Sequence, residues 1–277
     1  MTQLATVTLT GVDSHAHIFH QGLRLADSRR YSPDYDATVE QYLGHLDDCG
    51  LSHGVLVQPS FLGTDNSHMV AALRRFPHRL RGTAVVERDA ADESLDELAE
   101  AGVVGIRLNL IGQPLEDYRS APWRTLFAKV AQRGWSVEIQ RGMEDLDVVV
   151  PQILKSGVAV VIDHFGLPNG EIDPVNSHHQ ALLSLLSSEN IWVKLSATYR
   201  SRSNLDQARC SIDRLRDAYG HSERLLWGSD WPHTRFESQT DYEAQFALMQ
   251  TLLPNAAERQ RILADNPATL FKIGPAN

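Results

Sequence analysis

Two histidines that alternate along a short extended run have a spacing suited to chemistry. His15 and His17 stand in the run Asp13-Ser-His-Ala-His17. Side chains at positions i and i+2 of a strand lie on the same face, so both imidazoles can point into one cavity. Such a pair can bind a metal ion or donate hydrogen bonds to a developing oxyanion. We expect Asp13 to orient a neighbouring loop or ring.

An aspartate and a third histidine follow two other apolar runs. Asp230 comes directly before Trp231-Pro232 and is a candidate general base, because a carboxylate close to a water molecule can remove its proton. The same residue type is also common at helix caps and turns. His164 follows the run that ends at Asp163 and is the third candidate imidazole.

Arginines at the ends of such runs favour an acidic substrate. Arg107 would face the cavity, and its partner is either an internal carboxylate, Glu138 or Asp163, or a carboxylate of the substrate. Arg200 lies in a later loop. Since a guanidinium binds a carboxylate in bidentate fashion, two or three convergent arginines would imply an anionic ligand. Further expected substrate contacts are Ser60, Gln140, Tyr199 and His233, with Arg119 and Arg141 as weaker candidates.

Eight short β-rich runs position these residues. Several are almost continuously apolar, as expected for parallel strands that are buried on both faces. The expected strands are Leu9–Ser14, Gly54–Gln58, Gly82–Val86, Val103–Leu108, Trp135–Gln140, Val158–Asp163, Ile191–Leu195 and Leu225–Gly228.

Helix-like segments lie between most of these runs. Glycines such as Gly50 and Gly102 follow helix ends, and Asp92 is the expected N-cap of one helix. The expected helices are Thr38–Cys49, Asp92–Ala101, Pro122–Arg133, Asp145–Lys155, Ser177–Ser188, Leu205–Tyr219, Tyr242–Leu253 and Ala256–Asp265. The loops expected to shape the pocket are Phe61–Ser67, Leu110–Ser120 and Leu167–Ser177.

The alternation of strands and helices predicts an α/β fold with one parallel sheet. Eight repeats favour a single (β/α)8 TIM-barrel domain over residues 1–277. The absence of a GxGxxG or P-loop motif after an early strand argues against an open nucleotide-binding sheet. In such a barrel the active site lies at the C-terminal ends of the strands, where the residues named above gather.

The composition narrows the class of partner. The 277 residues contain 26 Lys+Arg and 35 Asp+Glu, so the formal net charge is −9, which argues against a nucleic-acid-binding surface. A small anionic substrate is compatible with this negative charge, because a pocket can be locally cationic.

Cys49 and Cys210 predict neither a disulfide framework nor a cysteine zinc site. We find no signal peptide and no apolar run long enough to span a membrane, and therefore expect a cytoplasmic protein without membrane partners. The oligomeric state is left open, a homo-oligomer included.

Taken together, five segments resemble the amidohydrolase superfamily, and most closely its branch of 2-pyrone-4,6-dicarboxylate lactonase and related lactonases. They occur in order between residues 12 and 233. They are Val12-Asp-Ser-His-Ala-His-Ile-Phe19, Gly105-Ile-Arg-Leu-Asn109, Val161-Ile-Asp-His-Phe-Gly166, Val193-Lys-Leu-Ser196 with Tyr199-Arg200, and Leu226-Trp-Gly-Ser-Asp-Trp-Pro-His233.

The resemblance implies a distorted TIM barrel and hydrolysis of an ester, lactone or amide without a metal. In that scheme Asp230 would deprotonate water and later protonate the leaving oxygen. The carbonyl would be polarised by His15, His17 and His164, and substrate carboxylates would be held by Arg107 and Arg200. We therefore predict a hydrolase that opens a carboxylate-bearing lactone, in the catabolism of aromatic or sugar acids.

Departures from the family pattern keep alternatives open. Metal-dependent members often carry a bridging lysine and two later histidines at strand ends, whereas Arg107 and Gln140 stand here and His164 alone follows, so a binuclear site is not expected. No second arginine closely follows Asn109, which makes a mono-anionic or sugar lactone as compatible as a dicarboxylate. The alternatives are a mononuclear zinc amidohydrolase using His15, His17, His164 and Asp230, an aromatic-acid decarboxylase, and a non-catalytic barrel that binds small molecules.

Overall fold

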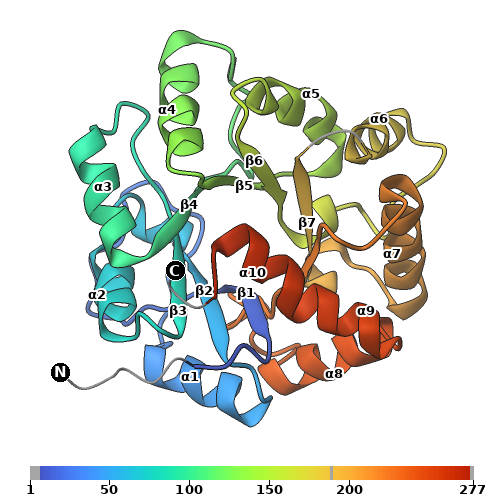
Figure 1. Ribbon diagram of the computed structural model, residues 1–277, viewed down its shortest axis with the longest axis horizontal. Helices are drawn as coiled ribbons and strands as arrows, with labels where there is room; N and C mark the ends of the chain where they lie inside the picture. Colours follow the sequence, from blue (N-terminus) through green and yellow to red (C-terminus); the bar gives the residue numbers. More distant parts are fainter. Residues whose placement is uncertain (1–6, 188–189, 275–277) are drawn as a thin grey trace.

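Eight parallel strands form the centre of the molecule, and each pairs with the next along the chain (Figure 1). The computed structural model describes residues 7–187 and 190–274. The strands are β1 (Val12–Ala16), β2 (His53–Val57), β3 (Leu80–Ala84), β4 (Val103–Asn109), β5 (Ser136–Gln140), β6 (Ala159–Ile162), β7 (Ile191–Leu195) and β8 (Leu225–Trp227).

The sheet closes on itself just beyond the ends of β1 and β8. The amide of His17 donates to the carbonyl of Trp231 at 2.7 Å, and the amide of Asp230 donates to the carbonyl of His15 at 2.8 Å. The seam of the barrel therefore runs through three of the residues that carry the expected chemistry. The predicted (β/α)8 TIM barrel is confirmed.

Helices surround the barrel on all sides (Figure 1). They are α1 (Val39–Asp48), α2 (Ser67–Arg75), α3 (Asp92–Ala101), α4 (Ala121–Gln132), α5 (Met143–Leu154), α6 (Ser177–Leu186), α7 (Leu205–Tyr219), α8 (Tyr242–Leu252), α9 (Ala256–Gln260) and α10 (Asn266–Phe271). Short helical turns η1 (Ser60–Leu62), η2 (His164–Gly166) and η3 (Thr198–Ser201) follow β2, β6 and β7, and η4 (Arg261–Asp265) joins α9 to α10. In the described part of the chain, none of the helices has the length and apolarity needed to cross a bilayer.

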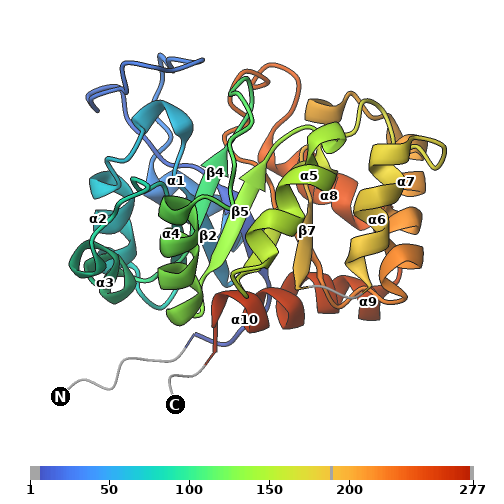
Figure 2. The same cartoon turned by 90° about the horizontal axis from the view of Figure 1, so that it is seen from above.

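The barrel interior is apolar at one end and charged at the other. Val161 and Trp192 belong to a buried cluster with Phe271, and α10 covers the N-terminal ends of the strands (Figure 2). Two residues further along, the same strands or their ends carry Asp163 and Lys194, which are also fully buried. Since side chains alternate along a strand, these charges form the next interior layer towards the C-terminal rim.

Most predicted elements are confirmed, with ends shifted by a few residues, and four corrections follow. The strand predicted at Leu9–Ser14 runs from Val12 to Ala16, so His15 lies within β1. The helix α2 was not predicted. Asp92 lies in the first turn of α3, whose N-cap is Ala91. The helix predicted at Ala256–Asp265 continues through η4 into α10, and the predicted end of α6 at Ser188 falls outside the described residues.

Candidate active site

A cavity of about 190 Å³ opens at the C-terminal ends of the strands. Its walls come from the strand ends and from the loops after β1 and β8, which rise above the barrel rim (Figure 2). Four arginines and one aspartate are among its charged residues. It is lined by His17, Arg30, Tyr31, Pro59, Ser60, Phe61, Arg107, Asn109, Gln140, Arg200, Asp230, Thr234, Arg235 and Phe236.

Three imidazoles surround one carboxylate oxygen at the floor of this cavity. The Nε2 atoms of His15, His17 and His164 each lie 3.8 Å from Asp230 Oδ1. These distances exceed a hydrogen bond, and Asp230 Oδ1 is buried without a hydrogen-bond partner, as are Nε2 of His15 and of His164. Buried polar atoms normally have partners, so this gap is built to receive a polar atom or an ion.

The other carboxylate oxygen of Asp230 is fully engaged. Oδ2 accepts hydrogen bonds from the Tyr199 hydroxyl at 2.5 Å and from Arg200 Nε at 2.6 Å. Asp230 adopts a left-handed backbone conformation, with φ of 61°, which turns the chain sharply after β8. Burial acts to raise its pKa, but Arg200 and the surrounding imidazoles hold the pKa of Asp230 well below its usual range. The residue is therefore an aimed, ionised carboxylate.

Hydrogen bonds on the far side of each ring restrict the histidines. His17 Nδ1 lies 2.7 Å from the carbonyl oxygen of Val57, which can only accept, so Nδ1 donates and Nε2 presents a lone pair. His164 Nδ1 lies 2.8 Å from Ser196 Oγ. Burial lowers the pKa of His17 to about 3 and that of His164 to about 4. Both rings are neutral at physiological pH.

A cluster of buried charges supports the floor from below. Lys194 Nζ lies 2.5 Å from Glu138 Oε2 and 3.4 Å from Asp163 Oδ1. His15 Nδ1 lies 3.1 Å from Lys194 Nζ and 3.2 Å from Asp163 Oδ1. Burial and the neighbouring Asp163 raise the pKa of Glu138 to about 7, although Lys194 and Arg107 oppose this.

Asp13 has the orienting role expected from the sequence. Its carboxylate accepts from the amide and hydroxyl of Ser229 at 2.8 and 2.6 Å and from the amide of His15 at 3.1 Å. These bonds tie the end of β1 to the turn that carries Asp230.

Both arginines expected at the site reach the cavity, and both have internal partners. Arg107 lies 3.4 Å from Asp163 Oδ2 and 3.8 Å from Glu138 Oε1, and it donates to Gln140 Oε1 at 2.9 Å. Of the two partners considered for Arg107, the internal carboxylates are thus present, while its position in the wall leaves it accessible to a ligand. Arg200 is paired with Asp230.

The structure brings most of the sequence-predicted residues together. Ser60 and Gln140 line the cavity. Tyr199 lies behind its wall, where its hydroxyl donates a hydrogen bond to the lining residue Asp230. His233 is the exception, because its Nδ1 lies 3.1 Å from the Tyr199 hydroxyl while its ring borders a neighbouring cavity of about 520 Å³. The weaker candidates Arg119 and Arg141 do not line the cavity; they pair with Asp117 and Asp145.

Sequence reasoning missed two cationic residues of the cavity and gave a third, Lys194, no role. Arg30 and Arg235 come from the loops after β1 and β8, and Arg30 Nη2 donates to Asn109 Oδ1 at 2.9 Å. Lys194 lies inside β7, where an ammonium in an apolar strand was the available signal. No periodicity could have placed the two loop arginines.

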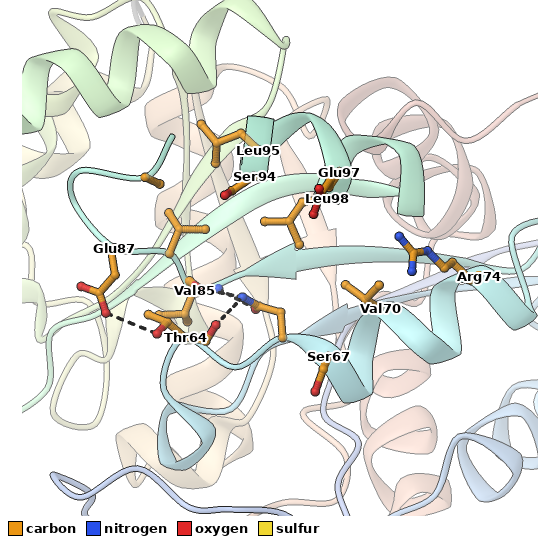
Figure 3. A pocket seen from close by; sticks show the side chains of 13 residues that line it. Thr64, Ser67, Val70, Arg74, Val85, Glu87, Ser94, Leu95, Glu97 and Leu98 are labelled. Atoms are coloured by element: carbon orange, nitrogen blue, oxygen red, sulfur yellow. Dashed lines mark hydrogen bonds between the residues drawn. The ribbon is translucent and has the colours of Figure 1, made fainter. Parts of the chain in front are cut away.

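A larger cavity, of about 450 Å³, lies outside the barrel between α2 and α3 (Figure 3). Its charged side chains include Arg74, Glu87 and Glu97, and Thr64 donates to Glu87 at 3.3 Å. None of the buried unpartnered side-chain atoms found in the described residues belongs to its lining. The buried unpartnered atoms therefore favour the smaller cavity at the strand ends as the candidate active site.

The donor atoms around Asp230 Oδ1 are of a type that can hold a metal ion. His15, His17 and Asp230 form one group with suitably close ligand atoms, and His15, Asp163 and His164 form another. The unpartnered nitrogen and oxygen atoms at the gap fit zinc, which accepts imidazole and carboxylate ligands.

Comparisons with known proteins agree with this geometry. The profile of the amidohydrolase family (Amidohydro_2) matches residues 12–273. The chain is 29% identical over 274 residues to 2-pyrone-4,6-dicarboxylate hydrolase of Comamonas testosteroni, covering 94% of this chain and 89% of that protein. It is 29% identical over 276 residues to 4-sulfomuconolactone hydrolase of Rhizobium radiobacter, with the same coverage. A solved structure from Pseudomonas putida, of a candidate 2-pyrone-4,6-dicarboxylic acid hydrolase, superposes with a TM-score of 0.91 at 43% identity, covering 97% of this chain and all of the other.

Proposed function

The chain belongs to the amidohydrolase family, and on that premise we propose that it hydrolyses the ester bond of a small anionic lactone. The observation that carries this proposal is the gap in which Asp230 Oδ1 faces three imidazole nitrogens at 3.8 Å. The relatives named above are hydrolases of a pyrone dicarboxylate and of a sulfomuconolactone, both of which are lactones.

The proposed reaction begins with a water molecule in the gap. Asp230 Oδ1 accepts a proton from this water while the water oxygen attacks the lactone carbonyl carbon. The second O–H of the water donates a hydrogen bond to the Nε2 lone pair of His17, which orients the nucleophile. The sequence had suggested a donor role for His17, but the bond to Val57 favours this acceptor role.

The carbonyl oxygen becomes an oxyanion in the tetrahedral intermediate. We assign its stabilisation to Nε2–H donors on His15 and His164, the latter with its Nδ1 accepting from the Ser196 hydroxyl. When the intermediate collapses, the ring C–O bond breaks and protonated Asp230 returns its proton to the alkoxide leaving group. The product is a hydroxy acid, whose new carboxyl group ionises.

Two arginines at the cavity mouth favour a substrate with two anionic groups. Arg107 and Arg200 have carboxylate partners within the protein. Among the residues that the structure describes, the guanidinium groups of Arg30 and Arg235 have none. An unpaired guanidinium is suited to a carboxylate or sulfonate, so we propose a dianionic lactone over the mono-anionic or sugar lactones that the sequence left open.

We propose that these side chains act without a resident metal. A zinc-dependent form of the same hydrolysis is the second candidate, favoured by the unpartnered atoms at the gap. Zinc held by His15, His17, His164 and Asp230 would lower the pKa of bound water and polarise the carbonyl.

The test is hydrolysis of 2-pyrone-4,6-dicarboxylate, followed by loss of pyrone absorbance and by acid release, with and without prior chelation. Asp230→Asn is expected to lower kcat by a factor of about a thousand or more, since it loses the proton acceptor and leaves the fold intact. Asp217→Asn, at an exposed position on α7, is the matched control and should behave as wild type. Near-normal turnover by Asp230→Asn would refute the proposed base. Release of carbon dioxide in place of acid would point to a decarboxylase.

A further inference from the structure

The ring of His15 joins the reaction gap to the buried charges beneath it. On the gap side, its Nε2 lies 3.8 Å from Asp230 Oδ1. On the other side, its Nδ1 lies 3.1 Å from Lys194 Nζ, 3.2 Å from Asp163 Oδ1 and 3.4 Å from Glu138 Oε1. A neutral imidazole carries one ring proton, so the role of Nδ1 decides what Nε2 offers to the substrate.

The contacts of Nδ1 differ in their hydrogen-bond geometry. The contact with Lys194 has hydrogen-bond geometry. Asp163 Oδ1 and Glu138 Oε1 lie 3.2 and 3.4 Å from Nδ1 as charged neighbours, and neither oxygen has a partner in hydrogen-bond geometry. An ammonium group can only donate, so Nδ1 of His15 accepts from Lys194 and the ring proton lies on Nε2.

His17, two residues along the same strand end, has the opposite arrangement. Its Nδ1 faces the Val57 carbonyl at 2.7 Å, which forces the ring proton onto Nδ1. The pair therefore presents one N–H donor and one lone pair to the gap. A hydrolytic water and a carbonyl oxygen need these two complementary partners.

We propose that Lys194 is a positioning residue that fixes His15 as the Nε2–H tautomer, so that His15 acts as a hydrogen-bond donor to the lactone carbonyl rather than as a metal ligand. This inference rests on the proposed lactone hydrolysis. The Lys194 cation draws electron density from the ring, which makes Nε2–H a stronger donor to an oxyanion. A nitrogen that carries a proton has no lone pair for a metal, so the same bond disfavours zinc at this position.

The direct test is ¹⁵N NMR of the histidine-labelled wild-type protein at neutral pH. His15 is assigned by the loss of its signals in His15→Gln, and His17 by the same substitution. The expected spectrum shows a pyridine-type Nδ1 and a pyrrole-type Nε2 for His15, and the reverse for His17, which serves as the internal reference. A pyridine-type Nε2 on His15 would overturn the proposal without reference to any activity.

The Lys194→Met variant tests the consequence for catalysis. Loss of the donor should shift the His15 proton to Nδ1, beside Asp163, and lower kcat about 10²–10³-fold, with a much smaller change in KM. Because this variant leaves buried carboxylates uncompensated, the double variant Lys194→Met/Glu138→Gln keeps the cluster balanced and is measured beside it. Lys155→Met, at an exposed position after α5, is the control and should match wild type.

Zinc titration of the metal-free protein, followed by calorimetry, supplies a readout apart from turnover. The Lys194→Met protein should bind zinc at least about tenfold more tightly than wild type, since partners of a ligating histidine alter metal affinity by 10–100-fold. Equal zinc affinity in both proteins would contradict the proposal. If no lactone is turned over but the expected tautomers are found, the proposed function fails and the assignment of Lys194 stands.

Discussion

The two oxygens of one carboxylate have different tasks in this site. Asp230 Oδ2 is held by Tyr199 and Arg200, and Oδ1 is left free towards the imidazoles. Because the held oxygen fixes the rotation of the group, the free oxygen is aimed before any substrate arrives. Preorganisation of this kind lowers the cost of reaching the transition state.

Arg30 provides a test of the second anionic group at this scale. Arg30→Ala is expected to raise KM for a dianionic lactone about ten- to a hundredfold with little change in kcat, because it removes a charge-assisted hydrogen bond of about 1.5–3 kcal/mol. A mono-anionic lactone should show no comparable effect. Steady-state kinetics with both substrates measures the difference.

Arg29→Ala is the matched control for this measurement. Arg29 is exposed, bonds to Ser32 and Ala26, and does not line the cavity. An equal KM change in both variants, or with both substrates, would remove Arg30 from substrate recognition.

The residues around the gap could be predicted because strand ends converge in a barrel. His15, His17, His164 and Asp230 stand at the ends of apolar runs, so topology alone brings them together. Arg30 lies in a long loop without periodicity, and its place beside Asn109 results from tertiary folding. Lys194 was part of a quoted motif but received no role, because a single cation within a strand does not reveal which carboxylates lie across the barrel interior.

At the scale of elements, the close approach of β1 and the turn after β8 determines the geometry of the floor. The register of β1 shifts between Asp13 and Ala16, which changes the direction of the side chains between them. Gly228 packs against this irregularity, since a Cβ placed on it would lie 2.5 Å from Cβ of His15. The seam requires both the irregular strand and a residue without a side chain.

Gly228→Ala is therefore expected to lower the free energy of unfolding by about 1–3 kcal/mol through overpacking, and to reduce kcat by displacing His15. Gly44→Ala, at an interior position of α1 with nothing within 4 Å of the added methyl, is the control and should raise stability by about 0.5–1 kcal/mol. Urea unfolding and turnover are measured on both. Unchanged stability and activity in Gly228→Ala would show that the seam tolerates a side chain.

The elements themselves were mostly predictable, and the failures have physical causes. The helix α2 has nine residues, and Asn66, at its N-cap position, bonds with Val85 and Thr64 instead of capping the helix. Neither the length of the segment nor a capping side chain therefore indicated α2 in the sequence. The continuation from α9 into α10 passes through a π-helical segment that ordinary helical spacing does not describe.

At the scale of the whole molecule, the sign of the net charge differs from the sign of the charge around the cavity. The chain carries a net charge of −9, while four arginines line its cavity. A local cationic region on an acidic protein attracts small anions. The buried titratable groups lie along the barrel interior, so acid should affect the fold as well as the chemistry.

We expect stability to fall as the pH decreases from about 6.5 to about 4. Burial lowers the pKa values of His17, His164 and His233 to about 3, 4 and 4, so the unfolded chain binds more protons in this range. Burial raises the pKa values of Asp13 and Glu138 to about 6 and 7, which acts in the opposite direction.

The histidines outnumber these two acids, and each excess proton on the unfolded chain costs about 1.4 kcal/mol per pH unit. Urea unfolding at pH 7, 6 and 5 measures the slope. A free energy of unfolding that stays constant or rises towards pH 5 would contradict the expectation.

The helix that covers the N-terminal end of the barrel also has a kinetic consequence. Phe271 of α10 packs under the strands and closes the N-terminal end of the barrel. Substrate and product therefore pass through the rim that the arginines line. Ring opening adds a carboxylate, so the departing acid carries more negative charge than the molecule that came in. The electrostatic attraction that favours substrate binding also slows product release, so we expect release of the acid to limit turnover and to become faster at higher salt concentration.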